Sequence, residues 1–254
     1  MAGKKNTKQL LFDYDSFTLK VIAMVMMMIG TVGVSIIQNG ILDMGALNIE
    51  TLAEVLGREN VSFWLITALF LCGGIMALAL PIHAYLLVEG YKKTSSVAKY
   101  ALRIFLLALV SEVPYDLAMQ GSWFTMNSQN PVWGVLIAFI IIYFLKYFEN
   151  IKKVKGVLLK LLIVLAGVIW AGMLNVNYGV GFVLAASVFW LFEDRGTLKT
   201  ILAGIATLFY FPAPLGMAFN YLCNEEKGRD GRILFYIVYP VQLLVFGLIG
   251  KFLL

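Results

Sequence analysis

Residues 62–88 have the sequence SFWLITALFLCGGIMALALPIHAYLLV, which contains no Asp, Glu, Lys or Arg. A helix needs about 20 consecutive apolar residues to cross the hydrocarbon core of a bilayer. This stretch is long enough and lacks the charges that would oppose insertion. It therefore predicts a transmembrane helix.

Similar apolar stretches follow one another along the chain. The predicted spans are 19–37, 62–88, 100–118, 131–148, 156–173, 178–192, 198–212 and 233–253, with a short segment at 213–223. The polar segment 38–60 is expected to be an outer loop with a short helix at 48–57, and residues 1–18 an amphipathic amino terminus. The predicted fold is an all-α polytopic membrane protein, one integral membrane domain over 1–254 with about eight or nine transmembrane or re-entrant segments in one bundle.

The composition agrees with this fold and excludes several others. Of 254 residues, 61% are hydrophobic and 14% are charged, whereas soluble domains carry about 25% charged residues. A soluble enzyme, a disordered chain and a disulfide scaffold are therefore excluded. We attribute the pI of 9.1 to basic loops rather than to nucleic-acid binding, and expect the lipid bilayer as partner. One histidine and two distant cysteines predict no metal site.

Basic residues alternate between the two sides of these spans. The outer segments 111–130 and 174–177 contain no Lys or Arg, and 38–60 contains only Arg58. The other segments contain Lys4, Lys5, Lys8 and Lys20, then Lys92, Lys93, Lys99 and Arg103, then Lys146, Lys152, Lys153, Lys155 and Lys160, then Arg195 and Lys199. Because cytoplasmic loops are enriched in Lys and Arg, the amino terminus is predicted to be cytoplasmic.

The alternation becomes ambiguous near the carboxyl end. Lys227, Arg229 and Arg232 should also be cytoplasmic, which requires the chain to cross and return between 198 and 223. That stretch is too short for two full spans, so Pro212 and Pro214 predict a broken, re-entrant segment at 212–223. The alternative is one tilted span followed by an exported basic loop.

Polar residues that are far apart in sequence collect at the predicted outer ends of the spans. They are Ser111, Glu112, Tyr115 and Asp116, then Gln129 and Asn130, then Asn177 and Tyr178. Glu112 and Asp116 are four residues apart and share a helix face if the helix continues through Pro114. This predicts either an outward-facing polar site around the two carboxylates or a set of interfacial caps.

A second polar group lies near the predicted inner ends. His83 is in the inner half of its span, where it is either a proton relay or a satisfied core residue. Glu89, Lys92, Lys93 and Arg103 follow at the membrane surface, where Glu89 and Arg103 could pair.

The motifs of the chain resemble those of the TraX-like family of pilin N-acetylation proteins. The matching stretches are 19–25 (LKVIAMV), 80–91 (LPIHAYLLVEGY), 111–117 (SEVPYDL), 129–130 (QN), 177–179 (NYG) and 235–244 (FYIVYPVQLL), in order over most of the chain. The resemblance implies a multi-pass protein of the bacterial cytoplasmic membrane. It also implies transfer of acetyl from acetyl-CoA to an amino terminus, with a peptide or pilin-like acceptor or another membrane protein as partner.

An acetyltransferase with a rearranged site would use the following residues of this chain. Glu112, Asp116 and His83 are expected to be catalytic, because acyl transfer to an amine needs a base. Acetyl-CoA, the co-substrate, is assigned to Glu89, Lys92, Lys93 and Arg103. The acceptor is assigned to Ser111, Tyr115, Gln129, Asn130, Asn177, Tyr178 and Gln242.

Several positions depart from the family pattern. Gly30 and Thr31 stand for a usual Asp-His pair, Ala77 for an Arg, His83 for a Phe, Asn177 for an Asp and Gln242 for a His. Asn and Gln preserve hydrogen bonding but carry no proton at neutral pH. Three functions remain open: an acyltransferase with a rearranged site, a catalytically degenerate binding or accessory subunit, and a small transporter or permease subunit.

Overall fold

The structure is a computed structural model that describes residues 14–45, 47–58, 61–223, 226, 228–229 and 231–253. The predicted amphipathic residues 1–13, with Lys4, Lys5 and Lys8, and also Lys227 lie outside the described residues. The described residues form helices and contain only two isolated β-bridges.

The helices follow the order of the apolar stretches. They are α1 (Ser16–Val32), the π-helix η1 (Gly33–Ile41), α2 (Ile49–Leu56), α3 (Phe63–Lys92), α4 (Val97–Gln120), α5 (Pro131–Tyr147), α6 (Lys153–Met173), α7 (Gly179–Leu191), α8 (Gly196–Ala206), the 3₁₀ turns η2 (Leu208–Tyr210) and η3 (Ala213–Gly216), α9 (Met217–Tyr221) and α10 (Arg232–Leu253). The all-helical fold is thus confirmed.

Four helical segments are long and apolar enough to cross a membrane: Ser16–Ile41, Phe63–Lys92, Lys153–Met173 and Ile233–Leu253. Three shorter apolar helices are Pro131–Tyr147, Gly179–Leu191 and Gly196–Ala206. By length and composition the described residues therefore support four spans, and the larger number of crossings stays a prediction.

Two predicted boundaries differ from the structure. The loop expected at 38–60 begins later, because η1 continues α1 to Ile41 and buries Gln38 and Asn39. The side-chain amide of Gln38 donates to the carbonyl of Gly45 and that of Asn39 to the carbonyl of Ala118 on α4, so these polar residues connect the end of η1 to the segment after it and to α4. The span expected at 198–212 is interrupted, because α8 ends at Ala206 and only short turns follow.

Side-chain caps explain where the long helices begin. The oxygens of Asp15, Ser62, Ser96 and Asn130 accept hydrogen bonds from the first-turn amides of α1, α3, α4 and α5. The first amides of a helix have no partner inside it, and short polar side chains supply one. The same polar residues that separate the apolar stretches therefore define the helix starts.

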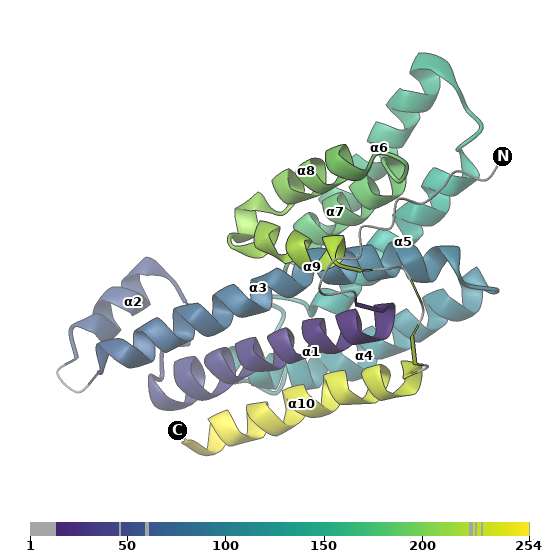
Figure 1. Ribbon diagram of the computed structural model, residues 1–254. Helices are drawn as coiled ribbons and strands as arrows, with labels where there is room; N and C mark the ends of the chain where they lie inside the picture. Colours follow the sequence, from purple (N-terminus) through teal and green to yellow (C-terminus); the bar gives the residue numbers. More distant parts are fainter. Residues whose placement is uncertain are drawn as a thin grey trace.

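The helices form two neighbouring groups (Figure 1). In one, α1, α3, α4 and α10 run side by side, with α1 packed on α3 and α10 packed on α4 and η1. In the other, α7 packs on α5, α6 and α8. Contacts of α3 with α7 and of α4 with α5 join the groups, and the largest buried apolar cluster extends through both.

Close backbone approach joins α10 to η1. A Cβ added to Gly250 would lie 2.1 Å from the carbonyl oxygen of Ser35, so only glycine fits there. The hydroxyl of Ser35 also donates to the carbonyl of Phe246 at 2.7 Å. Small residues allow helix backbones to approach closely in membrane proteins, where interhelical packing replaces the hydrophobic effect.

Candidate functional site

A cavity of about 490 Å³ is lined by helices of both groups. Its walls come from α1, α3, α4, α5 and α10, together with the start of α7. It extends along α4 from Tyr100 to Met119, roughly 28 Å at a rise of 1.5 Å per residue. We call the end near Arg103 the basic end and the end near Tyr115 the polar end.

Among the described residues, three cationic side chains line the basic end: Lys20 of α1, Lys93 at the end of α3 and Arg103 of α4. The carboxylate lining this end is Glu89, which accepts from Lys93 Nζ at 3.2 Å. Among the described lining residues of this end, cations thus outnumber carboxylates, and the basic end can attract an anionic ligand.

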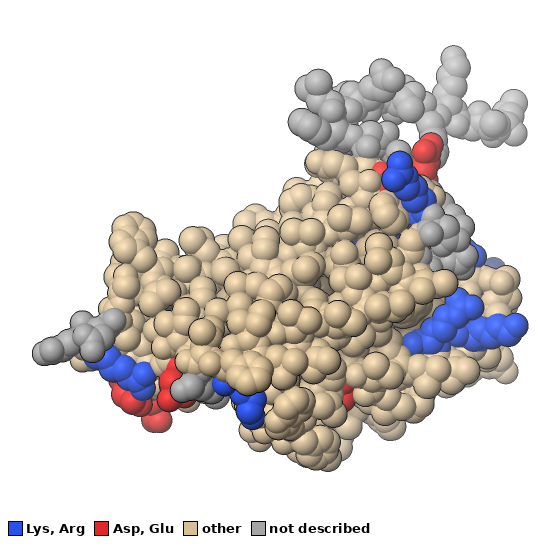
Figure 2. Space-filling view, turned by 90° about the horizontal axis from the view of Figure 1, so that it is seen from below, with Lys and Arg blue, Asp and Glu red and all other residues tan. Residues whose placement is uncertain are grey.

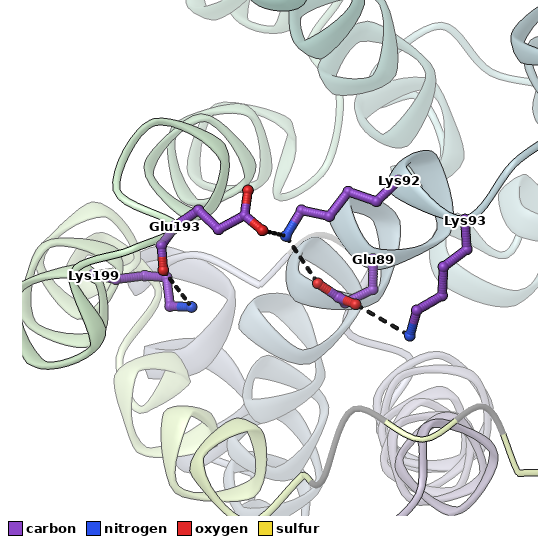
Figure 3. Close-up of polar contacts among 5 residues, drawn as sticks. All are labelled: Glu89, Lys92, Lys93, Glu193 and Lys199. Atoms are coloured by element: carbon purple, nitrogen blue, oxygen red, sulfur yellow. Dashed lines mark hydrogen bonds and ion pairs between the residues drawn. The ribbon is translucent and has the colours of Figure 1, made fainter. Parts of the chain in front are cut away.

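Glu89 bonds to two lysines that follow it on α3 rather than to Arg103, because residues three and four apart share a helix face. Lys92 Nζ lies 3.0 Å from Glu89 Oε1 and 2.7 Å from Glu193 Oε1 (Figure 3). Lys92 reaches Glu193 and thereby ties α3 to the turn between α7 and α8, where Lys199 donates to the Glu193 carbonyl. Of the four residues predicted to bind acetyl-CoA, Glu89, Lys93 and Arg103 line the cavity and Lys92 does not.

The middle of the cavity holds His83, with thioethers around it. His83 Nε2 lies 3.0 Å from Met27 Sδ, and Met24 and Met76 also line the cavity. The imidazole is the sole histidine of the chain and can accept a proton from a bound molecule.

The polar end is lined by neutral groups. Asn177 Nδ2 donates to the hydroxyl of Tyr115 at 2.9 Å, and both residues line the cavity with Tyr178 and Tyr239. The ring of Tyr178 lies 5.1 Å from that of Tyr210. Hydroxyl and amide groups from α4, α10 and the α6–α7 turn thus meet at one place.

Glu112 lies beside this end but is bonded elsewhere. The α4 helix continues through Pro114, so Glu112 and Asp116 lie one turn apart. The Glu112 carboxylate accepts from Trp133 Nε1 at 2.7 Å and from the side chain and backbone of Asn130. Asn130 also caps α5 and donates to the Ala108 carbonyl at 2.9 Å. Glu112 therefore connects α4 to the first turn of α5.

Asp116 is fully buried and holds the loop between α4 and α5. It accepts from the Thr125 amide at 2.9 Å and from Gln120 Nε2 at 3.1 Å. Gln129, further along this loop, exchanges backbone hydrogen bonds with Asn175 and Asn177, both at 3.0 Å. Neither Glu112 nor Asp116, nor Gln129 or Asn130, is among the described residues that line the cavity.

Ser111 and Gln242 are also separate from the cavity lining. Both are buried, and neither Ser111 Oγ nor the Gln242 amide has a hydrogen-bond partner among the described residues. Gln242 lines a smaller apolar hollow of about 270 Å³ with Met28, Val241 and Phe246. Of the predicted acceptor residues, the cavity thus brings together Tyr115, Asn177 and Tyr178.

Lys20 and the methionines of α1 were not predicted as site residues, although their spacing along the sequence places them on one helix face. Lys20, Met24, Met27 and Thr31 line the cavity at a spacing of four, three and four residues, which marks one helix face. A lysine on the same face as a row of methionines distinguishes this stripe from ordinary packing. Tyr239 could not be found this way, because every face of its helix is rich in apolar residues.

The described residues contain no group of three or more His, Cys, Asp or Glu that could hold a metal ion. Figure 2 shows one face of the molecule, whose broad middle is almost free of charged side chains. Such a surface suits contact with lipid.

Comparison with known proteins identifies the family. Neither the curated proteins nor the solved structures contain a match. The family model described as TraX protein matches residues 16–250, which is most of the chain. The chain therefore belongs to the TraX family.

Proposed function

We propose that the chain is an acetyltransferase of the bacterial cytoplasmic membrane. In this proposal acetyl-CoA approaches the basic end, and an amino terminus or another small acceptor meets the polar end. The observation that carries the proposal is one cavity that joins three cations, an imidazole and a set of hydroxyl and amide groups. We infer a multi-pass arrangement with the amino terminus in the cytoplasm from the apolar helices and the alternation of basic residues.

The residues at the basic end suit the donor. Coenzyme A carries phosphate groups, for which Lys20, Lys93 and Arg103 provide charge and hydrogen-bond donors. The volume of about 490 Å³ lies within the roughly 300–1,000 Å³ of ligand pockets. When bound, acetyl-CoA supplies an acetyl group already activated as a thioester.

The residues of the chain then have separate tasks. His83 accepts the proton that the acceptor loses, and its contact with Met27 holds the imidazole in the cavity. Asn177 and Tyr178 offer hydrogen bonds that orient the acceptor and steady negative charge on an oxygen. Glu112 and Asp116 act as positioning residues, since they hold α5 and the α4–α5 loop over the polar end.

Binding of the donor provides the first test. Purified full-length protein in nanodiscs is titrated with acetyl-CoA. Arg103→Gln is expected to weaken binding at least about tenfold, because a charge-assisted contact to phosphate contributes about 1.5–3 kcal/mol. Lys155→Gln is the matched control, because Lys155 is exposed on α6 and does not line the cavity. Equal affinity of the wild type and both variants would contradict the proposed donor site.

Turnover provides the second test. His83→Gln is expected to keep donor affinity and to lose release of the coenzyme A thiol. If this variant turns over at the wild-type rate, His83 is not the base.

A non-catalytic binding subunit is the second candidate. It is favoured by the two carboxylates beside the polar end, whose oxygens are occupied by structural hydrogen bonds. This candidate predicts no thiol release with any acceptor and stable co-purification with another membrane protein.

A further inference from the structure

We propose that the middle of the cavity is a binding site for a soft monovalent metal ion, Cu(I). The ligands are the imidazole of His83 and the thioethers of Met27, Met24 and Met76, all of which line the cavity. This inference goes beyond acetyl transfer and does not rest on it. It follows from the kinds of atom that the packing of α1 on α3 brings together.

The contact at the centre of this site joins an imidazole nitrogen to a sulfur atom. His83 Nε2 on α3 lies 3.0 Å from Met27 Sδ on α1. Bonds from metal ions to such nitrogen and sulfur atoms are about 2.0–2.3 Å long, so one ion can contact both atoms. As a hydrogen bond the same contact is weak, because a thioether is a poor acceptor.

Two further thioethers lie about one helical turn from Met27, on either side of it. Met24 precedes Met27 by three residues and lines the cavity with it, so the two share a face of α1. On the other side, Met76 Sδ lies against Gly30, where an added Cβ would be 2.6 Å from that sulfur. Because methionine side chains are flexible, the three thioethers and the imidazole can close on one ion.

The chemistry of these ligands selects the metal. Thioether sulfur is a soft ligand that favours Cu(I), and imidazole also binds copper. Zinc and calcium are held mainly by thiolates, imidazoles and carboxylates in groups, and the part of the chain that the structure describes has no group of three or more such residues. One histidine and two distant cysteines predicted no metal site, whereas here thioethers supply the remaining ligands.

The surroundings favour an ion with a single positive charge. The four ligands are neutral, and the α3 residues that line the cavity between Met76 and His83 are apolar. The cost of moving an ion out of water rises with the square of its charge. Along their helices, Lys20 is roughly 10 Å from Met27 and Lys93 roughly 15 Å from His83, and these cations repel a single charge less than a double one.

Cu(I) affinity provides the test. Full-length protein in nanodiscs, kept free of oxygen and without acetyl-CoA, is titrated with Cu(I) held by a competing chelator. We expect one Cu(I) per chain. Met27→Leu keeps the size and apolar character of the side chain but removes the sulfur. This variant should bind Cu(I) at least about tenfold more weakly, because even the loss of groups that support metal ligands costs about 10–100-fold. His83→Gln should weaken binding by a similar factor.

Met28→Leu is the matched control. Met28 is also on α1, but it lines the smaller apolar hollow and not the cavity. The substitution removes an identical thioether and should leave Cu(I) affinity unchanged.

A spectroscopic signature distinguishes thioether binding from thiol binding. Cys72 and Cys223 carry thiols, which also bind Cu(I). In protein that contains selenomethionine in place of methionine, only an ion bound by the modified side chains gives copper–selenium scattering in X-ray absorption. We expect this scattering from the wild type and from Met28→Leu.

Each result decides the inference. Equal Cu(I) affinity of Met27→Leu and Met28→Leu, or absence of copper–selenium scattering, would overturn the site, because the ion would then be bound elsewhere or not at all. Displacement of Cu(I) by an equal concentration of Zn(II) would overturn the assignment of a soft monovalent ion. Thiol release from acetyl-CoA is measured separately, so failure of the metal site and failure of the acetyltransferase proposal are distinguishable.

Discussion

Replacing Glu112 by glutamine separates a structural carboxylate from a catalytic one. Three donors converge on this side chain: Trp133 Nε1 at 2.7 Å, the backbone nitrogen of Asn130 at 3.4 Å and the side-chain Nδ2 of Asn130. Glutamine keeps one oxygen, which can still accept hydrogen bonds from Trp133 and from the Asn130 side chain. Its NH₂ group replaces the oxygen that accepts the hydrogen bond from the Asn130 backbone N–H, so one weak hydrogen bond and the negative charge are lost.

The expected cost follows from these contacts. Hydrogen bonds to charged groups contribute about 1.5–3 kcal/mol each, and neutral ones about 1 kcal/mol. Glu112→Gln should therefore lower the free energy of unfolding by about 1–2 kcal/mol. Glu112→Ala leaves the Trp133 and Asn130 donors without an acceptor and should cost about 3 kcal/mol or more.

Thermal unfolding in nanodiscs measures this effect, and thiol release from acetyl-CoA is measured on the same samples. At about 2–4 °C per kcal/mol for a chain of this size, the glutamine variant should melt about 2–8 °C lower and retain turnover. Glu149→Gln is the matched control, because Glu149 is exposed after the end of α5 and should leave the melting temperature unchanged. Loss of turnover in Glu112→Gln with an unchanged melting temperature would refute the structural role and restore Glu112 as the base.

Two further predictions concern helix packing and helix ends. Gly250→Ala should lower the free energy of unfolding by about 1–3 kcal/mol, because the added Cβ would lie 2.1 Å from the Ser35 carbonyl oxygen. Gly172→Ala is the control, because a Cβ at that position meets nothing within 4 Å. Equal melting temperatures of the two variants would contradict the packing. Asp15→Ala should cost about 1 kcal/mol at neutral pH through loss of the α1 cap. Hydrogen bonds from Thr18 lower the pKa of Asp15 below 3.8, so this stabilisation is present above pH 3.8 and is lost as the pH falls through the folded pKa. The difference between wild type and Asp15→Ala should therefore disappear in acid, and a difference that grows as the pH falls would refute the cap.

Much of the fold follows from local sequence. Apolar stretches such as 62–88 predicted the helices, and the caps before them, Ser62 and Asn130 among them, set where α3 and α5 begin. The departures occur where tertiary contacts replace local signals. Gln38 and Asn39 look like loop residues, yet the structure buries them at the end of a π-helix.

The candidate site was only partly predictable, because it depends on which way each side chain points, and the sequence does not show this. The sequence placed Glu112 and Asp116 near Tyr115, and all are on α4. It could not show that Tyr115 lines the cavity, while the two carboxylates accept hydrogen bonds from Asn130, Trp133 and Thr125. Because charged residues are scarce in this sequence, Glu112 and Asp116 stood out as catalytic candidates, although their hydrogen bonds are structural.

The sequence by itself determined the apolar helical character of the chain, its family resemblance and the segregation of basic residues. These properties depend on composition and on spacing along one helix, which are local. Only the tertiary structure decided that Lys20, His83 and Asn177, from three distant segments, line one cavity. The reason is physical: nearly every face of these helices is apolar, so hydrophobic pattern does not select which face turns inward, and close packing between helices makes that choice.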